Sequence, residues 1–135
     1  MPALWPLLRA MGKTDAEAAV LARAARLLGD PAHFLPVALS GGLAVGYAWA
    51  QDYGPHLRSG DRAARLHDLF VEEDQRRTGA GTLLMLAVTD WVRLRGTRWL
   101  QWQASAHAVP FYERIGLFGD PCPDPGHPFF EMEFQ

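Results

Sequence analysis

The chain has 135 residues, 49% hydrophobic and 21% charged, a length that suits one compact domain and is too short for two with normal cores, so we expect a single domain over residues 1–135. Its formal net charge of −2 provides no global positive field for a nucleic-acid backbone, and no apolar run reaches the roughly 20 residues that cross a bilayer. Cys122 is the only cysteine, which excludes an intrachain disulfide and is typical of a reducing, cytoplasmic compartment.

Two helices are predicted at the start of the chain. Leucines recur at helical spacing over residues 2–11, and Gly12 follows as a stop signal. Thr14 and Glu17 match a capping box, in which each side chain satisfies a free backbone N–H. We therefore expect the second helix to begin there and to run to Leu28.

Three extended segments follow. Residues 34–39 and 43–50 are apolar, and the glycine-rich turn at residues 40–42 joins them as a β-hairpin. Residues 51–60 hold two glycines and a proline, which indicates a loop, and residues 62–71 form a third strand. Alternation places Arg65, His67, Leu69 and Val71 on one face of that strand and Leu66, Asp68 and Phe70 on the other.

The longest helical pattern covers residues 79–95 and is followed by Gly96. A strand over residues 97–103, a short helix over 107–115 and a final strand over 129–134 complete the chain. Strands interleaved with helices predict an α/β or α+β domain with a mixed sheet. The apolar side predicted for the long helix consists of Leu83, Leu84, Ala87, Val88, Trp91 and Leu94.

The turn that precedes the long helix, residues 75–82, carries the pattern that indicates chemistry. Gly79 and Gly81 allow a ligand to approach the backbone closely, at the point where the first N–H groups of the helix are unpaired. Arg76 and Arg77 add positive charge, so an anion such as a pyrophosphate is the expected ligand.

Common nucleotide motifs do not fit this turn. It lacks the Lys-Ser/Thr pair of a Walker loop, and its glycines are not spaced as G-x-G-x-x-G. A helix that begins with two glycines only for packing remains an alternative at this point.

The sequence resembles the GNAT superfamily of N-acetyltransferases. Arg76-x-x-Gly79-x-Gly81 is similar to the family's acetyl-CoA pyrophosphate motif, Q/R-x-x-G-x-G/A. Residues 66–71 look like the family strand that diverges from its neighbour and pairs with the pantetheine arm. Residues 105–117 are similar to the family signature N-x-x-A-x-x-F-Y-x-x-x-G-F.

Three departures from the family pattern affect what we expect. Ser105 stands where the family usually has asparagine, and Leu117 stands in place of phenylalanine. The family normally opens with a β-strand, whereas this sequence opens with the helix predicted over residues 2–11. We therefore expect a GNAT-like fold without the usual first strand. Either the fold tolerates this loss, or another segment covers the exposed sheet edge, for example one from the second subunit of a homodimer.

The resemblance implies an N-acetyltransferase that moves the acetyl group of acetyl-CoA to a primary amine of a small molecule. A protein lysine or N-terminus is an alternative acceptor. A non-catalytic acyl-CoA sensor and a nucleotide-binding regulator are the alternative functions. The cofactor-binding residues that it implies are Leu69, Phe70, Val71, Arg76, Arg77, Thr78, Gly79, Ala80, Gly81, Thr82, Ser105, Ala108, Phe111 and Tyr112.

Acetyl transfer to an amine needs a group that removes a proton from the nucleophile. His67 is the first candidate because its pKa lies near the working pH, and Asp68 and Glu72 are alternatives. By resemblance, Tyr112 donates a proton to the coenzyme A thiolate, and backbone N–H groups of residues 69–71 are expected to hold the oxyanion. The structural alternatives are a half-buried strand histidine and a tyrosine that only packs beside its neighbour.

The acceptor pocket is the least specified part of the site. Trp49, Asp52, Tyr53 and Asp61 are candidates to receive a cationic amine through carboxylate pairing or cation–π contact. The five histidines lack metal-ligand spacing, so we expect no metal.

Overall fold

The computed structural model describes residues 4–12, 15–119, 126, 128 and 130–134. The chain divides into two compact units, Met1–Trp102 and Gln103–Gln135, and each is described by itself. The single domain expected over the whole chain therefore stays a prediction. Among the described residues, no helix is both long enough and apolar enough to span a bilayer.

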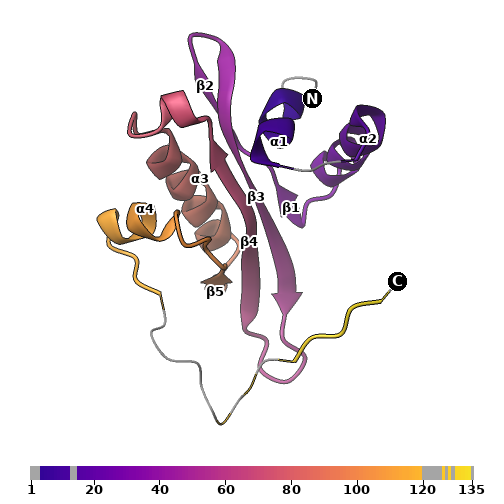
Figure 1. Cartoon of the computed structure of the whole chain (residues 1–135). Helices are drawn as coiled ribbons and strands as arrows, with labels where there is room; N and C mark the ends of the chain where they lie inside the picture. Colours follow the sequence, from indigo (N-terminus) through magenta and orange to yellow (C-terminus); the bar gives the residue numbers. More distant parts are fainter. Residues whose placement is uncertain (1–3, 13–14, 120–125, 127, 129, 135) are drawn as a thin grey trace. The chain divides into compact units, whose positions relative to one another are not determined.

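A mixed sheet with helices on both faces forms the first unit (Figure 1). Helices α1 (Trp5–Met11) and α2 (Glu17–Leu28) lie on one side of the sheet, and α3 (Ala80–Leu94) lies on the other. The sheet comprises β1 (His33–Phe34), β2 (Val37–Ser40), β3 (Leu43–Pro55), β4 (Arg62–Val71) and β5 (Thr97–Gln101).

The order of the strands is β1-β3-β4-β5, with β2 also paired to β3. Strand β3 runs antiparallel to β1, β2 and β4, whereas β4 and β5 are parallel. A parallel pair needs a crossover connection, and α3 provides it. The predicted mixed sheet is thus confirmed.

The predicted hairpin is present as β2 and β3. Gly41 and Gly42 connect the strands with φ angles of 57° and 80°, and a tight hairpin turn requires such positive values. The loop predicted over residues 51–60 is wrong in its first half, because β3 continues to Pro55. Gly54 has a φ of 77° within an irregular stretch of the β3–β4 pairing, and this conformation lets the strand continue past a local bulge.

The helices begin and end close to their predicted positions, but two details differ. Helix α2 begins at Glu17 with Ala16 as N-cap and without a side-chain capping bond, so Glu17 lies too early to serve as the far member of a capping box. Thr14, the other predicted member, lies outside the described residues. The predicted apolar side of α3 is partly wrong, because Leu83 and Leu94 are 65% and 89% exposed. The buried row consists of Ala80, Leu84, Met85, Val88 and Val92.

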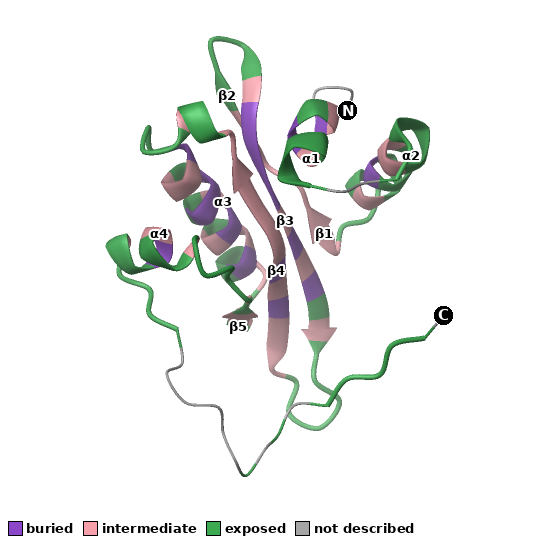
Figure 2. Cartoon of the chain, viewed as in Figure 1, coloured by how far each residue is buried: buried purple, intermediate pink, exposed green. Residues whose placement is uncertain are grey.

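Two layers of core lie on opposite faces of the sheet, and Figure 2 shows buried residues along β3 and along one side of α3. Tyr47 packs with Leu4, Leu7 and Ala24 beneath α1 and α2. The alternate residues of β3 on the other face are small, and this allows α3 to approach the sheet closely. These small residues are Gly46, Ala48 and Ala50.

The second unit contains one regular element among its described residues, the helix α4 (Val109–Arg114). Pro110 lies in its first turn, as expected. The final strand predicted over residues 129–134 is wrong for residues 130–134, which adopt no regular structure; Phe129 lies outside the described residues. A strand needs a hydrogen-bonded partner, and no strand of the described chain pairs with this segment.

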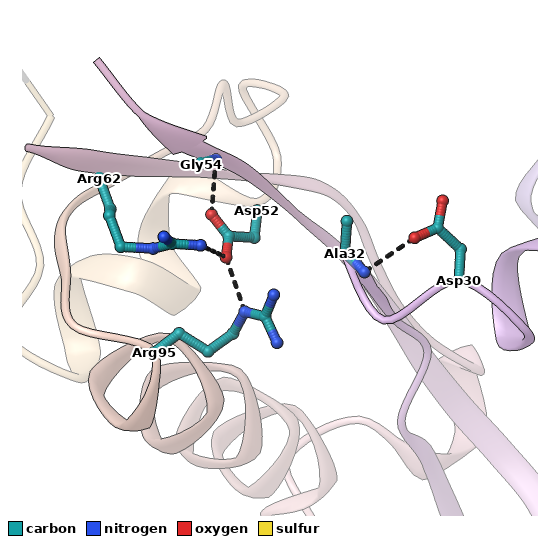
Figure 3. Close-up of polar contacts among 6 residues, drawn as sticks. All are labelled: Asp30, Ala32, Asp52, Gly54, Arg62 and Arg95. Carbon is teal, nitrogen blue, oxygen red and sulfur yellow. Dashed lines mark hydrogen bonds and ion pairs between the residues drawn. The ribbon is translucent and has the colours of Figure 1, made fainter. Parts of the chain in front are cut away.

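A buried carboxylate connects β3, β4 and the end of α3 (Figure 3). Asp52 Oδ2 accepts hydrogen bonds from Arg62 Nη2 at 2.7 Å and from Arg95 Nε at 2.6 Å, and its Oδ1 accepts one from the Gly54 N–H at 2.8 Å. Burial by itself raises the pKa of Asp52, but these three hydrogen bonds outweigh it and lower the pKa to about 2.

The close approach of β3 to β4 generates a first prediction. A Cβ added at Gly46 would lie 2.8 Å from the Phe70 carbonyl oxygen and 3.3 Å from Leu84 Cδ1, so we expect Gly46→Ala to lower the free energy of unfolding by about 1–3 kcal/mol. Gly29→Ala is the matched control, because its Cβ meets only carbonyl oxygens at 3.6 Å or more. Urea unfolding measures both, and equal stability of the two variants would contradict the packing described.

Asp52→Asn provides a second prediction. The folded pKa of about 2 lies below the unfolded value of ~3.9, so the ion pair stabilises the fold fully above pH ~4 and ceases to do so as the pH falls through 2. We expect the variant to be about 2–3 kcal/mol less stable at pH 7 and the difference from wild type to vanish near pH 2.

Asp61→Asn is the control for that experiment. Asp61 pairs with Arg98, whose side chain is 62% exposed, so its loss should cost at most about 1 kcal/mol. Thermal unfolding between pH 2 and 7 measures both variants. A loss as large for Asp61→Asn as for Asp52→Asn would show that the burial of the Asp52 pair does not matter.

Candidate functional site

The site begins where β5 stops pairing with β4. The β4–β5 register extends only from Arg62 to Arg65, so the rest of β4 has no strand on that side within the described chain. Pairing ends at Gln101, where β5 itself ends, so the expected divergence of this strand from its neighbour stays a prediction. An extended ligand with amide groups has the chemistry to take the vacant position.

Backbone direction identifies the groups that line this open edge. The Glu72 N–H donates to the Val45 carbonyl oxygen at 2.8 Å, so Glu72 faces β3. Because strand residues alternate, Phe70 also faces β3, whereas the N–H and C=O groups of Leu69 and Val71 face the open edge. Of the backbone N–H groups predicted to hold the oxyanion in residues 69–71, only those of Leu69 and Val71 therefore face the open edge.

His67 is an extra residue in β4. Trp49 is paired with Asp68 and Ala50 with Leu66, so His67 has no partner in β3 and forms a β-bulge. The division of faces predicted for this strand is consequently wrong. One extra residue reverses the alternation, and His67 and Asp68 both lie on the face that α1 and α2 cover.

Three side chains of β3 surround the His67 ring. Its Nε2 lies 2.8 Å from Gln51 Oε1, and its ring centroid lies 4.2 Å from that of Trp49. The Tyr53 ring lies at 71° to the imidazole, with the two ring centroids 6.4 Å apart. Burial lowers the pKa of His67, Arg65 and His33 lower it further, and Asp68 partly opposes them, so the imidazole is neutral at pH 7.

Asp68 is held by a buried tyrosine. The Tyr47 hydroxyl donates to Asp68 Oδ2 at 2.7 Å, and only 1% of Tyr47 is exposed. Burial, together with the charge and hydrogen bonding of Asp68, raises the pKa of the Tyr47 phenol, which therefore stays protonated. One oxygen of Asp68 is thus already engaged, as is one ring nitrogen of His67.

The turn before α3 has the backbone geometry of an anion site. Arg77 has a φ of 65° and Gly79 a φ of 92°, and α3 begins at Ala80 without a side-chain capping bond. The N–H groups of the first helical turn are therefore not capped by a side chain and point out of the helix. Thr78 closes the turn by donating from Oγ1 to the Gln75 carbonyl oxygen at 2.6 Å.

Arg76 connects this turn to the open edge of β4. Its Nε donates to the Val71 carbonyl oxygen at 3.0 Å, and its guanidinium lies 5.8 Å from the centroid of the Phe70 ring. The predicted positive charge of the turn is therefore held at the end of that edge.

The candidate acceptor residues separate into two groups. Trp49 and Tyr53 flank His67, as described above. Asp52 is saturated by two arginines, and Asp61 accepts a hydrogen bond from Arg98 at 3.0 Å, so these carboxylates serve ion pairs of the fold. Within the described chain, no three histidine, cysteine or acidic side chains gather as a metal site.

Sequence reasoning misses two neighbours of His67. It places Gln51 in a loop because the strand is expected to end at residue 50, and it places His33 before the first strand. Polar-apolar alternation does not continue past Ala50, because Gln51 and Asp52 are both polar, so this pattern could not have shown that the strand extends.

The second unit holds the remaining predicted residues. The Ala108 N–H donates to the Ser105 carbonyl oxygen at 2.9 Å, and this turn leads into α4 with Ala108 as N-cap. Phe111 meets Tyr112 edge to face, with ring centroids 5.0 Å apart. Burial raises the pKa of the Tyr112 phenol, so it remains a proton donor at neutral pH.

Comparisons with known proteins agree with this geometry. The sequence model of the Acetyltransferase (GNAT) family matches residues 2–117. A search of curated proteins gave no match.

Solved structures of similar fold include three proteins whose names state different activities. All three are below 25% identical to this chain, so they show the fold alone. AAC(6')-Iy in complex with the bisubstrate analogue CoA-S-monomethyl-acetylneamine is 20% identical with a TM-score of 0.79, covering 98% of this chain and 91% of that chain. Glucosamine-6-phosphate N-acetyltransferase from Arabidopsis thaliana is 17% identical with a TM-score of 0.75, covering 93% and 88%. Ribosomal-protein-alanine N-acetyltransferase from Brucella melitensis biovar Abortus 2308 is 22% identical with a TM-score of 0.73, covering 98% and 91%.

Proposed function

Because the chain belongs to the acetyltransferase (GNAT) family, we propose that it transfers the acetyl group of acetyl-CoA to a primary amine of a small molecule. The main observation behind this proposal is that the open edge of β4 leads directly to the turn before α3. The open edge of β4 ends at Val71, and Arg76 connects that end to the turn before α3. An extended amide-containing arm and a diphosphate match the two parts in this order.

The cofactor contacts follow from these two parts. The Val71 N–H and the Leu69 carbonyl oxygen bind the pantetheine amides, and the side chain of Phe70 packs nearby. The N–H groups at the start of α3 bind the pyrophosphate, with charge from Arg76 and Arg77. For Ser105, Ala108, Phe111 and Tyr112 the support is the sequence signature.

The chemistry needs a base because an alkylamine with a pKa near ~10.4 is neutral in only about one molecule in a few thousand at pH 7. His67 accepts the proton of the ammonium group, and the freed nitrogen lone pair attacks the thioester carbonyl. The N–C bond forms and an oxyanion develops, stabilised by the outward N–H group of Leu69. The C–S bond then breaks, and Tyr112 donates its proton to the thiolate. The second proton of the former amine nitrogen passes to the Tyr112 oxygen, which leaves a neutral amide and restores the phenol.

Two observations favour a small cationic amine as acceptor. The aromatic rings of Trp49 and Tyr53 lie beside His67, and the face of such a ring attracts a cation. Structures of similar fold include an aminoglycoside acetyltransferase in complex with sisomicin. A protein N-terminus is the second candidate, since a ribosomal-protein-alanine N-acetyltransferase has the same fold.

Two glycines that flank α3 provide a matched test of cofactor binding. Gly79 and Gly96 both have positive φ, 92° and 73°, and open space where a Cβ would lie, so alanine costs the backbone a similar amount at each. We expect Gly79→Ala to weaken coenzyme A binding by about tenfold or more, and Gly96→Ala to leave it within about twofold. Calorimetry with coenzyme A, ATP and NAD measures this. Equal affinities of the two variants, or binding of ATP or NAD alone, would contradict the proposal.

Turnover and its pH dependence test the catalytic roles. In a thiol-release assay with acetyl-CoA and a panel of primary amines, we expect His67→Gln to lower kcat by about 10²–10⁴-fold. Tyr112→Phe should lower kcat without changing coenzyme A affinity. Because the pKa of His67 is lowered, the acid limb of wild-type kcat should lie below pH ~6.5 and be absent in His67→Gln. Tight binding without turnover of any amine would identify a sensor instead.

A further inference from the structure

Gln51 determines where the proton of neutral His67 can lie. Its Oε1 is 2.8 Å from His67 Nε2, and a side-chain carbonyl oxygen only accepts hydrogen bonds. The contact is therefore a hydrogen bond only when Nε2 carries the proton. In the neutral ring, Nδ1 then carries the lone pair, and no described residue makes a hydrogen bond to it.

Trp49 fixes the plane of the same ring. The two rings are 4.2 Å apart at an interplanar angle of 35°. The Trp49 Nε1–H donates to His33 Nδ1 at 3.0 Å, so the indole cannot turn without losing that bond. The side chain of His33 is only 11% exposed, and its Nε2 lies 3.9 Å from Asp30 at the end of α2. The imidazole thus lies on a platform that is itself anchored to β1.

We propose that Gln51 is a positioning residue for His67, which holds the proton on Nε2 and thereby presents Nδ1 to the acceptor amine. The inference deepens the proposed function and rests on it for the role of His67 as base. In the transfer, an N–H bond of the ammonium breaks and an Nδ1–H bond forms. The Nε2–H bond to Gln51 persists in the resulting imidazolium, and a hydrogen bond to the charged form stabilises it.

Other groups around the ring do not fix the proton in this way. Arg65 and His33 act on it through charge and Asp68 opposes them, but none of these makes a hydrogen bond to His67 in the described chain. The Tyr53 ring makes a T-shaped contact with the imidazole, with the ring centroids 6.4 Å apart, and the Tyr47 hydroxyl donates to Asp68. Gln51 is therefore the residue whose change should move the proton.

Two substitutions separate positioning from packing. Gln51→Met keeps the length of the side chain and removes the acceptor, whereas Gln51→Glu keeps an acceptor and adds charge. Gln101→Met on β5 is the matched control, since that glutamine is exposed and its side chain makes no hydrogen bond within the described chain. Thermal unfolding first establishes that all variants are folded.

The first measurement is the tautomer of His67 in the full chain without substrate, by long-range ¹H–¹⁵N NMR above the pH of His67 protonation. We expect Nε2–H in wild type, in Gln51→Glu and in Gln101→Met, and a mixture with Nδ1–H in Gln51→Met. Nδ1–H in wild type, or an unchanged tautomer in Gln51→Met, would overturn the positioning role regardless of activity.

The second measurement is the pH profile of kcat and KM with acetyl-CoA and an accepted amine. Gln51→Met should lower kcat about tenfold with KM within about twofold, and Gln51→Glu should restore activity with its acid limb moved to higher pH, because a carboxylate stabilises the imidazolium. Equal kcat for Gln51→Met and wild type overturns the inference. If the tautomers are as expected but no amine is acetylated, the proposed function is overturned, whereas the role of Gln51 in holding the proton on His67 Nε2 is supported.

Discussion

Strand β4 has one residue more than β3 between the pairs Ala50–Leu66 and Trp49–Asp68, and the rest of the site depends on this bulge. A bulge bends its strand and increases the local twist. Pairing with β5 ends at Arg65, two residues before the bulged His67. The open backbone edge therefore begins where β5 ends, and the bulge two residues later places the His67 side chain on the same face as that of Asp68.

Contacts hold both ends of β4 in place, so the ladder hydrogen bonds that the bulge disrupts are confined to the middle of the strand. At one end Arg62 pairs with the buried Asp52, and at the other the Glu72 N–H donates to the Val45 carbonyl oxygen. Between them the absence of a side chain at Gly46 permits β3 and α3 to lie close to β4. Backbone N–H and C=O groups of a strand stay unpaired in a folded protein only where the surrounding structure holds the strand in place and keeps other segments from pairing with it.

The parts of the fold that local signals determine can be predicted from the sequence, and the parts that depend on a partner strand cannot. The bounds of β4 and the start of α3 follow from periodicity and from glycine, so they agree with the structure. The bulge at His67 depends on how many residues of β3 lie opposite this part of β4, and the sequence alone does not show which residues pair. The predicted apolar side of α3 is wrong at two positions for a related reason, because Leu83 and Leu94 extend the apolar pattern beyond the row that meets the sheet.

Burial shifts the pKa values of His67 and Tyr112, the two side chains proposed to transfer protons, in opposite directions. It disfavours the charged form of each, which lowers the pKa of His67 and raises the pKa of Tyr112. Both side chains are therefore neutral at pH 7, the histidine able to accept a proton and the tyrosine able to donate one. A lowered pKa also weakens a base, and the acceptor oxygen of Gln51 offsets this because it binds the Nε2–H more strongly once the ring is charged.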